Sequence, residues 1–322
     1  MYKHLFGPVP SRRLGMSLGI DLVPSKVCSL DCVYCEVGKT NTLTSKMEEY
    51  ITEKEICKEL EDYFQHQPDP DTFTLTGSGE PTLNNKLDAI ITFLRKHRPN
   101  VNIAILTNGT QLFDPKIRKS LLGVNLVLPS LDAASDEVLA KINRPIKGLS
   151  IDSYIEGIAA FRALQLQQTD AIRREMWLEI FILPHYNTDK AELDRLKKAI
   201  LYINPTSVQL NTLDRPGSVK NLIGATRAEL MEIKDYWNLD KVEIISANPD
   251  RKKIKAYHQN TEKSILETLA RRPCTLKDLT TFIGNPIHEI HKYLDVMEQD
   301  QLITSVKGER GTFYQLKTKV VE

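Results

Sequence analysis

The chain has 322 residues, of which 41% are hydrophobic and 26% are charged, and its net charge is +1. This length suggests about two domains, and the small net charge excludes a global field that would draw the protein to nucleic acid or to a membrane. No apolar run approaches the roughly 20 residues that span a bilayer, and the first residues lack the apolar stretch of a signal peptide, so we expect no membrane partner.

Short strand-like runs alternate with amphipathic helical patterns over the first 250 residues. The runs end in turn residues and cover 16–23, 72–77, 101–108, 124–132, 176–184 and 206–213. The helical patterns cover 52–64, 84–97, 114–122, 153–164, 189–203 and 225–237, and two begin with capping boxes, Thr52 with Glu55 and Thr226 with Glu229. This order predicts an α/β fold with a parallel sheet. Six units are too few for the eight-stranded barrel, which leaves a partial (βα)6 barrel or an open doubly wound sheet.

The composition changes at 248–260, which is polar and basic. Two short helical patterns follow at 261–273 and 275–284, and a third covers 285–299, with Asn285 as N-cap and Pro286 at the first helical position. Residues 302–317 form two strand patterns around a glycine-containing turn. Three helices and a hairpin predict a winged helix-turn-helix. We therefore predict a core domain of residues 1–250, a linker of 251–259 and a winged helix-turn-helix domain of 260–322.

Three of the five cysteines, Cys28, Cys32 and Cys35, are spaced C-x3-C-x2-C, with Tyr34 before the third. This crowding does not suit a disulfide framework, and a reducing cytoplasm is the simplest location. A structural zinc site needs four ligands, usually in two pairs, and no second pair exists here. An iron–sulfur cluster normally takes four cysteines. Three cysteines on one loop would leave one iron open for a ligand that is not protein.

This motif resembles the cluster motif of the radical S-adenosylmethionine (SAM) superfamily. The resemblance implies a partial (βα)6 barrel with one [4Fe–4S] cluster on Cys28, Cys32 and Cys35, whose open iron chelates SAM. It also implies an electron donor, a flavodoxin or a ferredoxin. An electron from the cluster cleaves SAM to a 5′-deoxyadenosyl radical, which abstracts hydrogen from a substrate; the cofactor carries this chemistry, and the protein positions it.

Motifs at the ends of the next three strands support the same interpretation, because working residues of βα-barrels collect at the carboxyl ends of strands. After the second strand, Gly77, Ser78 and Gly79 would let the backbone approach SAM, and Glu80 would receive its ammonium group. Thr107 and Asn108 end the third strand, and Ser130 and Asp132 end the fourth. The resemblance places these in contact with SAM. Taken singly, each motif is also ordinary turn chemistry.

Further candidates come from single residues. Arg144 would pair with the SAM carboxylate or lie on the surface. Glu179, within an apolar strand, would cap an exposed edge or point into the barrel, where it would contact a ribose or substrate. Lys26 would bind an anion or face water. Five polar residues at or beyond the last two strand ends would line a substrate cavity or be structural: His185, Asn187, Gln209, Asn211 and Arg215. Cys57 and Cys274 are expected to pack as small hydrophobes. No catalytic residue is assigned.

Residues 5–250 resemble in particular the branch related to the radical enzyme of tRNA wybutosine synthesis. That enzyme carries a second cluster on earlier cysteines, and this chain has no cysteine before Cys28. Three hypotheses follow: modification of a tRNA or other RNA base; modification or activation of a peptide, protein or small molecule; and an iron–sulfur sensor that regulates transcription. The third helix of the C-terminal domain is acidic, which is poor for duplex DNA; we expect this domain to deliver an RNA, peptide or protein substrate.

Overall fold

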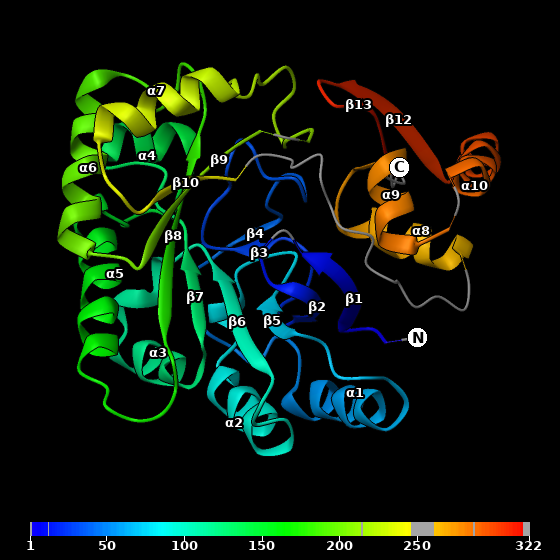
Figure 1. Cartoon of the computed structure of the whole chain (residues 1–322), viewed down its shortest axis with the longest axis horizontal. Coiled ribbons are helices and arrows are strands. Elements are labelled where there is room, and N and C mark those ends of the chain that lie inside the picture. The colour runs from blue at the N-terminus through cyan, green and yellow to red at the C-terminus, as the bar shows by residue number, and fades with distance from the viewer. Residues whose placement is uncertain (1, 12, 214, 246–260, 286, 318–322) are drawn as a thin grey trace. The chain divides into compact units, whose positions relative to one another are not determined.

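The computed structural model describes residues 2–11, 13–213, 215–245, 261–285 and 287–317 (Figure 1). The chain divides into two compact units. The first contains Met1–Val33, Lys39–Thr212 and Ile223–Ser246, and the second contains Tyr34–Gly38, Leu213–Leu222 and Ala247–Glu322. Two short segments of the predicted core domain are thus grouped with the C-terminal residues. The predicted linker, 251–259, lies outside the described residues.

The first unit is built on an eight-stranded sheet whose order is β1-β2-β5-β6-β7-β8-β9-β10. All six predicted strands are present. They are β2 (Gly15–Asp21), β5 (Thr72–Thr76), β6 (Asn102–Thr107), β7 (Leu126–Pro129), β8 (Glu175–Ile182) and β9 (Ser207–Thr212). Neighbours among them pair in parallel. The result is the predicted α/β fold with a mostly parallel sheet, and it is consistent with a partial barrel.

Two edge strands were not predicted. β1 (Leu5–Ser11) runs antiparallel to β2, and β10 (Val242–Ile244) runs parallel to β9. The segment of β1 contains Gly7, Pro8 and Pro10, which argue against a strand in a sequence pattern. Proline is nevertheless tolerated at the edge of a sheet, because its missing N–H faces away from the ladder. β10 is too short to give a pattern of its own.

Helices lie on the outer side of the sheet in the first unit (Figure 1). The predicted ones are α1 (Glu53–His66), α2 (Leu87–His97), α3 (Pro115–Ser120), α5 (Ile151–Leu166), α6 (Lys190–Ile203) and α7 (Arg227–Trp237). Both predicted capping boxes form, at Thr52 and Thr226. A further helix, α4 (Asp136–Ile142), was not predicted. No helix within the described ranges has the length and apolar character needed to cross a membrane.

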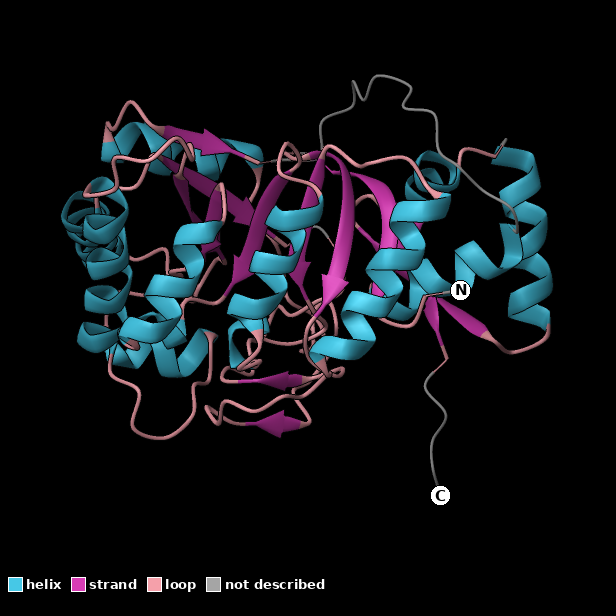
Figure 2. Cartoon of the chain, turned by 90° about the horizontal axis from the view of Figure 1, so that it is seen from below, coloured by secondary structure: helices cyan, strands magenta, loops and turns pink. Residues whose placement is uncertain are grey.

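Helices of the first unit lie against the sheet (Figure 2), and the core consists of the buried apolar side chains that these elements contribute. Strands buried on both faces appear as unbroken apolar runs, and all four residues of β7 are buried. The helices contribute one apolar face each: α1 buries Ile56, Leu60 and Tyr63. This packing fixes the sheet and leaves its carboxyl edge to loops.

Short elements lie at this carboxyl edge. They are the parallel pair β3 (Val27–Cys28) and β4 (Thr42–Leu43) and the 3-10 turns η1 (Pro81–Leu83) and η2 (Thr110–Phe113). A further 3-10 turn, η3 (Leu121–Gly123), follows α3.

The second unit contains α8 (Thr261–Arg271), α9 (Leu276–Ile283) and α10 (Ile287–Gln299), followed by the hairpin of β12 (Ile303–Gly308) and β13 (Gly311–Leu316). A two-residue strand that was not predicted, β11 (Cys274–Thr275), completes a sheet of order β11-β13-β12. Buried Ile265, Leu279, Phe282 and Leu294 form its core. Apart from β11, the elements and their order are those predicted, while Pro286 lies outside the described residues. Membership of the winged-helix class stays a prediction.

Candidate functional site

Four sequence motifs follow neighbouring parallel strands, and the fold brings them to one edge of the sheet. The cysteine loop follows β2, Gly77–Glu80 follows β5, Thr107 and Asn108 lie at the end of β6, and Ser130–Asp132 follows β7. Direct contacts link them. The Ser130 backbone N–H donates to the Thr107 carbonyl at 3.1 Å, and Glu80 accepts from both Thr107 and Asn108. The predicted meeting of these motifs is therefore present in the structure.

Glu80 is the centre of this network, and its side chain is buried. Its Oε1 accepts from the Thr82 N–H at 3.1 Å, the Thr82 hydroxyl and the Thr107 hydroxyl at 2.6 Å. Its Oε2 accepts only from the Asn108 N–H, at 2.6 Å, among the described residues. Burial raises the pKa of Glu80, although these hydrogen bonds favour the ionised form. A carboxylate has about four lone-pair sites, so Oε2 keeps room for a further donor such as an ammonium group.

Gly79 allows the loop before Glu80 to lie against the backbone that leads into the cysteine loop. A Cβ at this position would come within 2.0 Å of the Val27 carbonyl oxygen, so a side chain has no space. The Lys26 N–H donates to the Ser78 carbonyl at 2.7 Å. Lys26 is itself buried and has a left-handed backbone, with φ of 65°. The alternative that Lys26 faces water is therefore wrong, and the approach of Gly77 to SAM stays a prediction.

Asn108 connects the end of β6 to the first cysteine. Its Nδ2 donates to the Ser29 hydroxyl oxygen at 2.9 Å and to Cys28 Sγ at 3.5 Å. Its Oδ1 accepts from the backbone N–H of Thr110 at 3.0 Å. Its carbonyl accepts from the hydroxyl of Tyr154, a residue of α5 that sequence reasoning missed. Burial is the main cause that raises the pKa of Tyr154 well above its usual value. The nearby charges of Asp132, Cys32, Glu80 and Cys28 raise this pKa further.

Asp132 is joined to the second cysteine through a residue that the sequence did not single out. The buried carboxylate accepts from Asn143 Nδ2 at 2.7 Å and from the Phe181 N–H at 2.8 Å. Asn143 Nδ2 also donates to Cys32 Sγ at 3.4 Å. Sequence reasoning selected the neighbouring Arg144 because it is charged. An asparagine in a connecting segment carries no pattern that would have identified it.

The segment that carries Asn143 holds the cysteine loop by its backbone. The Asp31 N–H donates to the Asn143 carbonyl at 2.9 Å, the Val33 N–H to the Ile142 carbonyl at 3.0 Å, and the Ile146 N–H to the Ser29 carbonyl at 3.0 Å. These bonds fix Cys28 and Cys32 with respect to Asp132.

Arg144 is exposed on the same segment, with a left-handed φ of 47°. It lines an open hollow of about 650 Å³ together with Asp31 and Lys147. Its pairing with a SAM carboxylate stays a prediction.

The side chain of Glu179 pairs with another residue of this chain. Its Oε2 pairs with Arg13 Nη1 at 2.6 Å, and the same nitrogen donates to the side chain of Gln209. Arg13 comes from the turn between β1 and β2, and nothing in its local sequence indicated this contact. Asn187 is fully buried and donates to the carbonyls of Asp132 and Phe181, both at 2.8 Å. Gln209 and Asn187 therefore have structural partners; cavity-lining roles for His185 and Asn211 are untested.

The second unit holds Tyr34 and Cys35, both half-buried. In this unit Arg215 is buried and pairs with Glu36 at 3.2 Å and with Asp278 at 3.6 Å, which favours a structural role over a cavity. Cys274 is fully buried, as expected for a small hydrophobe, whereas Cys57 is half-buried. Burial raises the pKa of each of these two thiols to about 11.

No group of three His, Cys, Asp or Glu side chains within the described ranges is close enough to hold one metal ion. An iron–sulfur cluster binds each cysteine through a different iron, so its ligands need not converge on one point. The donor set suits such a cluster: the cysteines are not in disulfides, and side-chain amides donate to two of the sulfurs. Hydrogen bonds to sulfur are a normal feature of protein-bound clusters.

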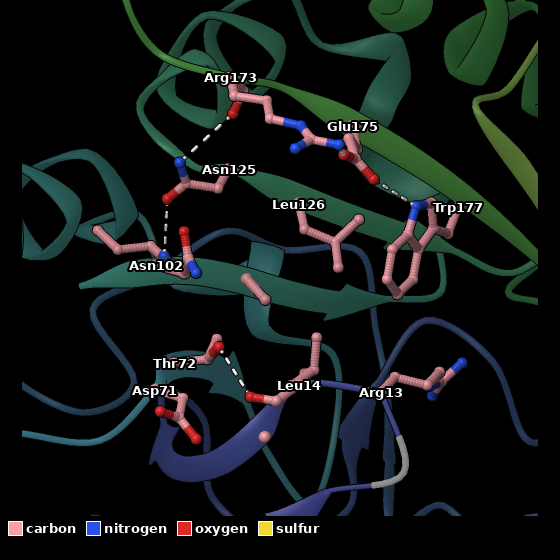
Figure 3. A pocket seen from close by; sticks show the side chains of 13 residues that line it. Arg13, Leu14, Asp71, Thr72, Asn102, Asn125, Leu126, Arg173, Glu175 and Trp177 are labelled. Carbon is pink, nitrogen blue, oxygen red and sulfur yellow. Dashed lines mark hydrogen bonds and ion pairs between the residues drawn. The ribbon is translucent and has the colours of Figure 1, made fainter. Parts of the chain in front are cut away.

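A second hollow, of about 480 Å³, lies at the opposite edge of the sheet (Figure 3). It is lined by residues that begin strands, including Thr72, Asn102 and Leu126. Its polar side chains largely pair with one another: Glu175 accepts from Trp177 Nε1 at 2.8 Å and pairs with Arg173 at 2.5 Å. Neither a motif cysteine nor Glu80 lines this hollow, although Arg13, which does line it, also pairs with Glu179.

Comparison with known proteins gives the family. Residues 22–197 match the family model described as the radical SAM superfamily. A Brachyspira hyodysenteriae protein named GTPase Obg is 34% identical over 275 residues, covering 85% of this chain and 39% of that protein. A UPF0026 protein of Methanocaldococcus jannaschii is 36% identical and covers 67% of this chain and 65% of that protein. This chain thus spans less than two thirds of the length of either relative.

Two further similarities are weaker. An S-adenosyl-L-methionine-dependent tRNA 4-demethylwyosine synthase of Danio rerio is 28% identical, covering 54% of this chain and 24% of that protein. The crystal structure of a radical SAM methyltransferase from Sphaerobacter thermophilus superposes with a TM-score of 0.50 at 15% identity, covering 71% of this chain and 66% of that one. The structural similarity concerns the fold alone.

Proposed function

The chain belongs to the radical SAM superfamily and is an enzyme, and we propose that Cys28, Cys32 and Cys35 hold one [4Fe–4S] cluster that binds SAM at its open iron. When bound, the cluster supplies the electron for the reductive cleavage of SAM to a 5′-deoxyadenosyl radical, which abstracts hydrogen from the substrate. A flavodoxin or a ferredoxin is the proposed electron donor. The protein's own task is to bind, orient and shield these groups.

Glu80 carries the proposal. It is a buried carboxylate whose described partners are all neutral donors, and its Oε2 accepts only the Asn108 N–H. Such a group favours a cation as a further partner, because a buried charge is costly until it is paired. The ammonium of SAM is a cation of this kind. Asp132 is held by Asn143 and the Phe181 N–H, so it orients the loop after β7 and the cysteine segment together.

Anaerobic reconstitution of the purified chain tests this function. We expect about four iron atoms per chain for one cubane cluster, and 5′-deoxyadenosine and methionine on addition of SAM and dithionite. SAM should alter the electron paramagnetic resonance spectrum of the reduced cluster. A tightly bound zinc, or a cluster whose spectrum does not respond to SAM, would contradict the proposal.

An RNA base, as in tRNA, is the first candidate substrate. The similarity to the Danio rerio tRNA 4-demethylwyosine synthase supports it, although this chain covers 24% of that protein. Mass spectrometry of the modified nucleosides of total RNA, with and without the gene, tests it. A nucleoside that disappears on deletion and returns with the intact gene, but not with a Cys32→Ala variant, would identify the base.

A peptide or protein substrate is the second candidate, and one observation favours it. α10 exposes Asp295 and Glu298, and Asp300 follows the helix, whereas binding to nucleic acid rests mainly on cations that contact phosphates. We propose that residues 260–318 deliver the substrate and do not regulate transcription. Comparison of the proteomes with and without the gene, together with gel shifts of the full chain on tRNA and on duplex DNA, separates the candidates; sequence-specific duplex binding would support the sensor.

A further inference from the structure

Two asparagine side chains, that of Asn108, which is half-buried, and that of Asn143, which is buried, reach two of the three motif cysteines. Asn108 lies after β6 and donates to Cys28 Sγ at 3.5 Å, while Asn143 lies after α4 and donates to Cys32 Sγ at 3.4 Å. We propose that these two amides are positioning residues that raise the reduction potential of the cluster by donating hydrogen bonds to its ligand sulfurs. The inference rests on the proposed function and extends it to two residues outside the cysteine motif.

The orientation of the Asn143 amide follows from its partners. Asp132 Oδ2 lies 2.7 Å from Nδ2. A carboxylate at neutral pH only accepts hydrogen bonds, so the amide nitrogen must face it and the oxygen must point elsewhere. The second N–H of the same nitrogen is then available to Cys32 Sγ. Because Asp132 is itself fixed by the Phe181 N–H, the donor to the sulfur is held from two sides.

Asn108 is held in an equivalent way. Its Oδ1 accepts from the N–H and the hydroxyl of Thr110, at 3.0 and 2.8 Å. These donors fix the oxygen and turn the nitrogen toward Ser29 and Cys28. Both amides are thus oriented by protein partners.

A further observation concerns the amide oxygen of Asn143. The side chain is buried, and its Oδ1 has no hydrogen-bond partner among the described residues. Buried acceptors without a partner are uncommon in folded proteins and often indicate a ligand or ion at the site. An acceptor at this place, beside the cysteine loop, fits a donor group of bound SAM.

The direction of the effect follows from charge. Reduction adds one electron to the cluster, and part of the added negative charge resides on the ligand sulfurs. An N–H donor stabilises the more negative state more strongly, so it raises the potential. Removal of either amide should therefore make the cluster harder to reduce, and removal of both should add the two effects if they act independently.

Asn187 provides the matched control. It is also a buried asparagine in contact with Asp132, but its Nδ2 donates to backbone carbonyls of Asp132 and Phe181 and its Oδ1 accepts from the Leu183 N–H. No described contact joins it to a cysteine sulfur. Asn187→Ala should therefore lower stability without changing the potential, which separates a general loss of packing from the loss of a donor.

The experiment is a redox titration of the reconstituted full chain, followed by electron paramagnetic resonance without SAM. At a fixed solution potential, Asn108→Ala and Asn143→Ala should each lower the ratio of reduced to oxidised cluster about threefold, where tenfold corresponds to about 59 mV for one electron. In heavy water, wild type should show deuteron couplings that each variant partly loses. The leucine variants, Asn108→Leu and Asn143→Leu, fill the space if the alanine variants fail to fold.

Two results would overturn the inference alone: potentials of both variants equal to that of wild type, or an equal shift in Asn187→Ala. A wild-type chain that takes up no iron would instead overturn the proposed function, and the inference with it. The iron content of wild type therefore distinguishes the two failures before any potential is measured.

Discussion

Buried carboxylates have different partners in the two units. In the first, Glu80 accepts only from neutral donors, namely Thr82, Thr107 and Asn108. In the second, Asp278 lies between Arg215 and Arg310, at 3.6 and 3.4 Å, and also caps α9 by accepting from the Thr275 N–H. The pKa values follow this difference. Burial raises the pKa of Glu80. At Asp278 burial also acts to raise the pKa, but the two guanidiniums and the hydrogen bonds from Thr275 together lower it.

The difference distinguishes a binding group from a structural one. A buried carboxylate without a cation keeps much of the cost of its desolvation until a cationic ligand arrives. A carboxylate already paired with two arginines has little to gain from a ligand and much to lose from the removal of a partner. The cysteines repeat the contrast, because Cys28 and Cys32 face amide donors whereas Cys274 is fully buried in an apolar core.

The largest expected effect lies at the cysteines. Cys32→Ala should abolish the cluster, because the motif supplies only three cysteine ligands and the cluster needs all three. Cys274→Ala should keep full iron content and lose stability, by about 1 kcal/mol for a small buried side chain. Iron analysis and thermal unfolding measure both. Normal iron in Cys32→Ala would break the contrast between the two kinds of cysteine.

Arg215 gives the next largest effect. Arg215→Met leaves Glu36 and Asp278 without their shared partner inside the second unit. Loss of one partner of a buried ion pair costs about 3 kcal/mol, at the lower end of the usual range because Arg310 remains. Denaturant unfolding at pH 7 measures it. Arg310→Met is the control: its side chain is 25% exposed, so its removal should cost about 1 kcal/mol.

Glu80 should affect binding more than stability. Glu80→Gln removes the negative charge at nearly constant volume and should weaken SAM binding about 30-fold, the equivalent of about 2 kcal/mol for a hydrogen bond to a charged group. Cluster content should stay close to wild type. Glu192→Gln is the matched control, because Glu192 is equally buried but already pairs with Arg195 at 2.7 Å. If Glu80→Gln and Glu192→Gln bound SAM with equal affinity, Glu80 would not be a binding group for SAM.

The smallest expected effect is a pair of losses at decreasing pH, which occur in different pH ranges because the pKa of Glu80 is raised and that of Asp278 is lowered. A carboxyl with a raised pKa is protonated at a higher pH than an ordinary glutamate, so SAM affinity should fall as pH decreases through that raised value, and Glu80→Gln should flatten the profile. Asp278 has a lowered pKa; its contribution to stability is full above the pKa of the unfolded state and is lost as pH falls through the lower folded value. Calorimetry at several pH values measures both.

Local patterns were sufficient for most of the fold. Apolar runs that end in turn residues gave all six parallel strands, and Thr52 with Glu55 and Thr226 with Glu229 gave two helix starts. The errors are also physical. β1 was missed because its prolines oppose a strand everywhere except at a sheet edge, and its place at the edge follows from pairing with β2, which no local pattern contains.

The sequence by itself determined the chemistry of the site: three closely spaced cysteines, a glycine-rich turn ending in Glu80, and polar residues after successive strands, all within segments a few residues long. Only the tertiary structure decided which side chains meet. Asn143, Tyr154 and Arg13 reach Cys32, Asn108 and Glu179 from segments 46 to 166 residues away in the sequence, because partners are selected by packing in space. Burial, which raises the pKa of Glu80 and lets neutral donors surround it, is likewise a property of the packed sheet and not of the motif.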